Sequence, residues 1–134
     1  MVIVGGELTQ ESLELSFDPV AHFYQAPPHL KAQDGMFVID DFGRQRVRPE
    51  ELLNRWILPM ERGFDLLTLH TGESFTVPFE IALMFSTNLR PDDLVDEAFL
   101  RRIPYKVHIP GPTREELCEI TRRVAAAKRL VCTE

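Results

Sequence analysis

Two short, continuously apolar runs constrain the fold of this chain most, because polar residues follow each of them at once. The first run, "MFVI" at residues 36–39, is followed by Asp40 and Asp41. The second run, "IALMF" at residues 81–85, is followed by "STN", which ends in Asn88. Continuous apolar runs of this length are typical of parallel strands that are covered on both faces. We therefore expect two fully buried strands with polar side chains at their carboxyl ends.

The rest of the chain predicts helices and strands in alternation, punctuated by proline, glycine and helix-capping residues. The expected strands lie at residues 1–4 and 105–109, and a hairpin over 64–79 has Gly72 in its turn. The expected helices are a short one after Thr9, a short one that follows a loop within 18–35, one over 48–60 that Pro59 ends or kinks, one over 92–103, and one that follows a capping box of Thr113 and Glu116.

This alternation predicts an α/β fold with a mostly parallel sheet. In such sheets, ligands bind at the carboxyl ends of the strands. Asp40, Asp41 and Asn88 fall at those ends, so we expect them to share one edge of the sheet.

Charge and length limit the classes of function. With 134 residues the chain suits one domain at most, and its net charge of −6 argues against nonspecific binding to nucleic acid or to an anionic membrane. No apolar run approaches the length of a membrane span. Cys118 and Cys132 fit no zinc or redox spacing, so we expect a reduced, cytoplasmic protein.

The polar residues after the strands suggest phosphate chemistry. A carboxylate such as Asp40 can hold Mg²⁺, and a second one such as Asp41 can orient or deprotonate an attacking water. Asn88 can hold that water or a γ-phosphate. Arg101 and Arg102 can stabilise a transferring phosphoryl group across a subunit boundary. The simpler alternatives are an acidic loop, an asparagine that caps a turn, and arginines paired with Asp96 or Glu97.

Taken together, these motifs resemble the AAA+ ATPases of the P-loop NTPase superfamily. "MFVIDD" is similar to the Walker B strand, "LMFSTN" to the sensor 1 strand, and "DEAFLRRIPYKVHIPGPTREELCEI" to the arginine-finger helix, the last core strand and the first lid helix. The resemblance implies a three-layer α/β/α core with a hairpin insertion. Residues 1–110 would be a partial core, and residues 111–134 would be the start of the helical lid.

The resemblance also implies ATP and Mg²⁺ as cofactors, with hydrolysis coupled to remodelling of a protein partner. Asp40 would be the metal ligand, Asp41 and Asn88 would be catalytic, and either Arg101 or Arg102 would act on a neighbour's nucleotide. The implied partners are further copies of the chain or full-length AAA+ subunits.

The sequence departs from the family in two ways. Asp41 stands where the family usually has glutamate, which shortens the reach of the base. The phosphate-binding loop needs a glycine-rich run that ends in lysine, and none of Lys31, Lys106 and Lys128 follows a glycine. We therefore expect an amino-terminally shortened core that is inactive by itself. The alternative is a noncatalytic interaction module that binds no nucleotide. A phosphoacceptor receiver domain is disfavoured, because no further acid follows an intervening strand.

Overall fold

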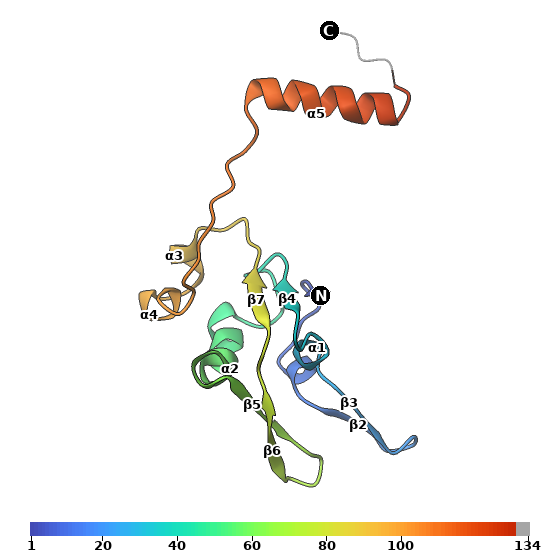
Figure 1. Ribbon diagram of the computed structural model, residues 1–134, viewed down its shortest axis with the longest axis vertical. Coiled ribbons are helices and arrows are strands. Elements are labelled where there is room, and N and C mark those ends of the chain that lie inside the picture. The colour runs from blue at the N-terminus through green and yellow to red at the C-terminus, as the bar shows by residue number, and fades with distance from the viewer. Residues whose placement is uncertain (131–134) are drawn as a thin grey trace. The chain divides into compact units, whose positions relative to one another are not determined.

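The computed structural model describes residues 1–130, apart from the side chains of Asp92 and Ala98, and divides the chain into two units (Figure 1). The first unit spans Met1–Pro104, and the second begins at Tyr105. Cys132 and the other residues after 130 of the expected lid segment lie outside the described residues.

A three-stranded parallel sheet lies at the centre of the first unit. Its strands are β1 (Val2–Val4), β4 (Met36–Ile39) and β7 (Ala82–Phe85), in the order β1-β4-β7. Two antiparallel hairpins accompany it, formed by β2 (Ser16–Asp18) with β3 (Phe23–Gln25) and by β5 (Phe64–Thr68) with β6 (Ser74–Pro78). The predicted mixed α/β class, the three parallel strands and the hairpin with Gly72 at positive φ are confirmed.

The helices alternate with these strands along the chain. They are the 3-10 helix η1 (Glu11–Leu13) and the α-helices α1 (Pro28–Lys31), α2 (Pro49–Arg62), α3 (Pro91–Leu94), α4 (Glu97–Leu100) and α5 (Arg114–Ala127). The helix expected over 92–103 is thus two short helices. Within residues 1–130, no helix combines the length and the apolar character that a membrane span requires.

The core of the first unit lies between α2 and one face of the sheet. Leu53 and Trp56 of α2 pack with Phe37 and Ile39 of β4, and the rings of Phe37 and Trp56 meet edge to face at 5.7 Å. This confirms the apolar face predicted for the helix. Pro59 was predicted to end or kink this helix. It does not end the helix, because α2 continues for three more residues to Arg62 and is capped by Gly63 at φ 71°. A kink at Pro59 stays a prediction.

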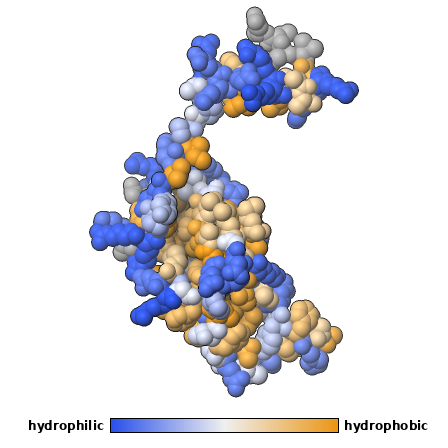
Figure 2. Space-filling model, viewed as in Figure 1, coloured by the Kyte–Doolittle hydropathy of each residue, from blue (hydrophilic) through white to orange (hydrophobic). Residues whose placement is uncertain are grey.

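The opposite face of the sheet is partly open to solvent, so the expectation of two fully buried strands is wrong. Ile3, Val38 and Met84 are neighbours across the three strands on this face. Ile3 is 57% exposed and Met84 is 48% exposed. Figure 2 shows apolar residues gathered over the centre of the first unit, where β4 and β7 lie in Figure 1. The apolar run fitted a strand covered on both faces, but among the described residues the core covers only one.

The β2–β3 hairpin occupies a segment for which the sequence predicted only a loop before its short helix. Asp18 Oδ1 accepts hydrogen bonds from the backbone N–H groups of Val20 and Ala21, which tightens the turn. The hairpin contacts the turn of the other hairpin, since the ring of His70 stacks on Phe17 at 3.9 Å. These two contacts fix a pair of strands that are too short to be recognised from the sequence.

The second unit contains an extended segment and then α5. Residues 105–109 belong to no strand, so the prediction of a strand there is wrong. A β-strand needs a neighbouring strand to pair with, and none of the sheets formed by residues 1–130 includes this segment. The capping box that precedes α5 is confirmed: the Thr113 side chain accepts from the Glu116 N–H, and the Glu116 side chain accepts from the Thr113 N–H.

Candidate functional site

The carboxyl ends of β4 and β7 lie side by side at one edge of the sheet. The two strands are parallel neighbours, with Met36 opposite Ala82 and Ile39 opposite Phe85. Asp40 and Asp41, here called the acidic doublet, follow β4 directly. Asn88 comes three residues after β7. The structure therefore brings the segments that carry these three predicted site residues together.

Hydrogen bonds tie the two strand ends to one another. The Phe42 N–H donates to the Ser86 carbonyl at 2.7 Å, and the Thr87 hydroxyl donates to the Phe42 carbonyl at 2.8 Å. The Thr87 hydroxyl oxygen also accepts from the Leu89 N–H at 3.1 Å. These bonds lie directly after the doublet in one segment and on both sides of Asn88 in the other, so the two segments are held in a fixed relation.

The loop after β4 has a constrained backbone. Asp41 has a φ of 51°, in the left-handed region that aspartate tolerates better than most residues. Gln45 stabilises this turn from within: its Oε1 accepts from the Gly43 N–H at 2.8 Å, and its Nε2 donates to the carbonyls of Asp40 and Asp41 at 3.0 and 3.2 Å. Gly43 has a φ of 99°, where any side chain would be strained, and a Cβ there would also overlap the end of the Leu94 side chain. The loop therefore favours glycine at this position.

The side chains of the doublet and of Asn88 are exposed. Within residues 1–130, no three histidine, cysteine or acidic residues gather into a ready-made metal site. Mg²⁺ in phosphate-handling sites commonly takes only one or two protein carboxylates and fills its other positions with water and phosphate oxygens. An exposed carboxylate pair at the end of a strand fits that use of the metal.

The turn that follows β1 lies at the same edge of the sheet, because β1 is parallel to β4. The Gly5 N–H in this turn donates to Glu7 Oε1 at 2.9 Å, and this hydrogen bond lowers the pKa of Glu7. The turn thus already holds a carboxylate from the chain itself, and it carries no lysine. The residues present fit a metal ion better than they fit a triphosphate chain.

The two arginines are held by neighbouring acids. Arg101 donates to Glu97 Oε1 at 2.8 Å, which is the simpler alternative that the sequence had left open for it. Arg102 Nε donates to Glu61 Oε1 at 2.7 Å, a contact that the sequence did not indicate.

The position of Arg102 follows from that of Glu61. Glu61 lies in the last turn of α2, and Gly63, which caps this helix, accepts a hydrogen bond from the Phe79 N–H at 2.9 Å, shortly before β7 begins. Arg102 is therefore held near the amino-terminal end of β7, whereas the doublet follows the carboxyl end of β4. The structure does not bring Arg102 and the doublet of one chain together.

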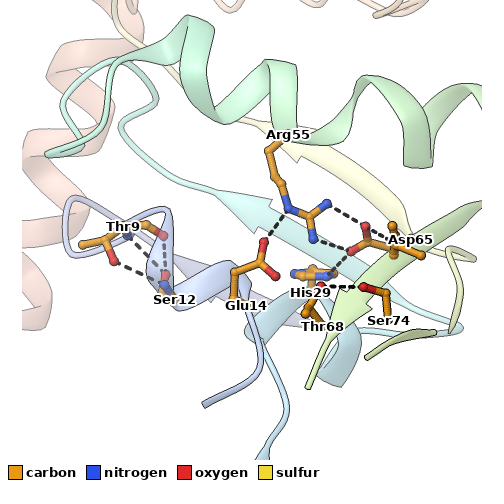
Figure 3. Close-up of polar contacts among 9 residues, drawn as sticks. Thr9, Ser12, Glu14, His29, Arg55, Asp65, Thr68 and Ser74 are labelled. Carbon is orange, nitrogen blue, oxygen red and sulfur yellow. Dashed lines mark hydrogen bonds and ion pairs between the residues drawn. The ribbon is translucent and has the colours of Figure 1, made fainter. Parts of the chain in front are cut away.

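A buried polar cluster elsewhere in the first unit was not predicted. Asp65 of β5 accepts from His29 Nε2 at 2.9 Å and from both terminal nitrogens of Arg55, at 2.6 and 3.0 Å (Figure 3). Arg55 Nε also donates to Glu14 at 2.9 Å. Asp65 is 1% exposed and His29 is 2% exposed, so a substrate could not reach them. The cluster therefore holds η1, α1, α2 and β5 together.

Electrostatics agree with a structural role for this cluster. Burial alone would raise the pKa of Asp65, but hydrogen bonds and charge from His29 and Arg55 outweigh it and hold the pKa below its usual value. One signal in the sequence could have shown that this aspartate is buried. In β5 it alternates with Leu66 and therefore shares the inward face with Leu67.

No protein-family model matches the chain, and a comparison with curated proteins finds no match either.

Proposed function

We propose that this chain is part of an AAA+-type ATPase, with Asp40 as a ligand of the Mg²⁺ ion in an ATP complex. Asp41 would orient the attacking water, and Asn88 would contact that water or the γ-phosphate. The observation that carries the proposal is the pairing of β4 and β7 as parallel neighbours in register. It is supported by the hydrogen bonds that link Phe42 to Ser86 and Thr87.

We also propose that the chain has the layers and the lid of that family. The three parallel strands would be part of an incomplete three-layer α/β/α core over residues 1–110. The described part of residues 111–134 would begin a helical lid. The phosphate cradle would come from other polypeptide in a cytoplasmic assembly of copies or related subunits. Mg²⁺ would supply charge neutralisation to the phosphate oxygens, and Asp40 would hold and orient it.

The arginines fit this proposal only across a subunit boundary. Glu61 holds Arg102 at the end of the first unit away from the doublet. An arginine in that position can reach a nucleotide on a neighbouring copy. Arg101 remains the other candidate for this role, since its exposed pair with Glu97 is weak and easily exchanged.

Paramagnetic broadening by Mn²⁺–ATP tests the proposal, because it detects weak binding. We expect the amide signals of Asp40, Asp41 and Asn88 to broaden first, and Asp40→Asn to abolish this effect. Glu73→Gln, which removes an exposed acid from the β5–β6 turn, is the matched control and should leave the broadening unchanged. Broadening that is equal at all exposed acids would contradict a site at the strand ends.

A noncatalytic interaction module is the second candidate, favoured by the exposed doublet and by the absence of a glycine–lysine loop from the sequence. Such a module would associate with complete subunits without holding nucleotide. Calorimetric titration of the chain with Mg–ATP separates the two. Affinity tighter than about 0.1 mM, which is about −5.5 kcal/mol, would rule this second candidate out.

A further inference from the structure

Strand β7 forms an open edge of the parallel sheet. Its position at the end of the order β1-β4-β7 leaves one side of the strand without a partner among the described residues. The Ala82 N–H donates to the Gly35 carbonyl and the Ser86 N–H to the Ile39 carbonyl, so the even-numbered residues face β4. In a parallel ladder the intervening residues, Leu83 and Phe85, direct their N–H and C=O groups to the other side. The open edge therefore offers backbone groups to one further strand.

A groove with both apolar and polar lining lies beside this edge, within the first unit. Its volume is about 340 Å³, and α2, β7 and the segment before residue 105 line it. Its apolar walls come from Met60, Phe79, Ile81, Leu83, Phe85 and Pro104, and Arg102 also lines it. A strand added to β7 would direct every second side chain into this groove. The apolar walls of the groove thus favour a strand with apolar residues at alternate positions.

The second unit contains a segment with this pattern. Tyr105, Val107 and Ile109 are 86%, 84% and 84% exposed, and they alternate with Lys106 and His108. The segment belongs to no sheet, and prolines at 104 and 110 bound it, so it is five residues long. Extended segments with exposed apolar residues at alternate positions are the kind of segment that adds as a strand to the edge of a sheet.

We propose that the open edge of β7 and its groove bind residues 105–109 of a second copy of this chain, in a reciprocal, two-fold exchange. Tyr105, Val107 and Ile109 of each copy enter the groove of the other. The backbone of the segment pairs with Leu83 and Phe85. This interaction does not depend on nucleotide binding.

The contact area favours reciprocal exchange over a single contact. Burying one tyrosine, one valine and one isoleucine removes roughly 330 Å² from water on the segment, and a similar area on the groove. A single contact would then bury about 660 Å² and a reciprocal pair about 1,300 Å², whereas stable, specific interfaces bury about 1,200–2,000 Å². Only the reciprocal arrangement reaches the size that a stable dimer needs.

Two measurements test the proposal: the mass of the chain in solution, and the hydrogen exchange of the backbone amides on the open edge of β7. Sedimentation of the full chain over a range of concentrations should show a monomer–dimer equilibrium. A Val107→Lys/Ile109→Lys variant should weaken dimerisation at least tenfold. These two side chains are exposed, so the first unit should stay folded. The matched control, Leu117→Lys/Ile120→Lys, adds the same charge to the exposed apolar stripe of α5 and should leave dimerisation unchanged.

Hydrogen exchange identifies the site of the contact. The amides of Leu83 and Phe85 should become protected as the concentration rises, and the Val107→Lys/Ile109→Lys variant should lose this protection. Those of Ala82 and Ser86, bonded within the sheet, should be protected throughout and serve as internal controls. A chain that is monomeric at every concentration overturns the proposal. So does a dimer that the Val107→Lys/Ile109→Lys variant retains, or edge protection that is independent of concentration, which would indicate residues 105–109 of the same chain.

Discussion

Replacing Asp65 by asparagine should destabilise the first unit strongly. Asparagine keeps the shape of the side chain but removes its charge, and its NH₂ group can only donate. Arg55 directs two N–H groups and His29 directs Nε2 at the oxygens of Asp65, so a donor would face donors. The guanidinium would also lose its buried counter-charge.

The magnitude follows from how deeply the cluster is buried. Removing one partner of a buried ion pair costs about 3–5 kcal/mol, because the other charge is left without compensation. Arg55 would keep its bond to Glu14, so we expect the lower end, about 3 kcal/mol. A domain of about 100 residues has a stability of about 5–15 kcal/mol, so this loss is a large part of the total. The expected fall in Tm is on the order of 12–24 °C.

Urea unfolding followed by the fluorescence of Trp56 measures this loss. Trp56 is the only tryptophan, is fully buried, and lies 6.3 Å from the ring of His29. Glu14→Gln is the matched control, since it removes a half-exposed partner of the same arginine and should cost no more than about 1 kcal/mol. If Asp65→Asn costs less than about 1 kcal/mol, or no more than the control, the cluster does not stabilise the fold as argued.

The depressed pKa of Asp65 contributes stability that is fully present above the pKa of an unfolded aspartate, about 4. This stability is lost as the pH falls through the pKa of Asp65 in the folded chain, which is lower still. The urea midpoint of unfolding should therefore fall more below pH 4 in the native chain than in Asp65→Asn. Gly43→Ala should cost about 1–3 kcal/mol by urea unfolding, because of the positive φ and the close approach of Leu94. An unchanged free energy of unfolding in Gly43→Ala would mean that the loop relaxes freely. Thr113→Ala should lower the stability of α5 by about 1 kcal/mol, because it removes the N-cap of the helix. NMR secondary shifts measure the resulting loss of helix, and Thr121→Ala in the same helix should cause no such loss.

Local patterns were sufficient to predict several elements. A proline in the first turn and apolar residues on one face predicted α2, and the pairing of Thr113 with Glu116 predicted the start of α5. The apolar runs before Asp40 and Asn88 predicted β4 and β7, and the rule for parallel sheets predicted that their polar ends share an edge. Each of these inferences depends on residues close together in the sequence or on a general rule of topology.

Contacts between distant residues decided the rest. The segment 105–109 has the pattern of a strand, yet it forms none, because the pattern alone supplies no neighbouring strand to pair with. Pro59 was expected to end or kink α2, but the helix continues past this residue, which is buried, and Gly63 forms the C-cap of the helix.

The sequence by itself determined which residues prefer to be helical or extended, and it placed the acidic doublet and Asn88 at the ends of strands. Tertiary structure alone decided which faces of the sheet are covered, that Arg102 is held away from the doublet, and that Arg55 and Asp65 meet His29. The physical reason is that burial and ion pairing depend on distances in space, and residues as far apart as 14, 29, 55 and 65 carry no mark in the sequence of meeting one another.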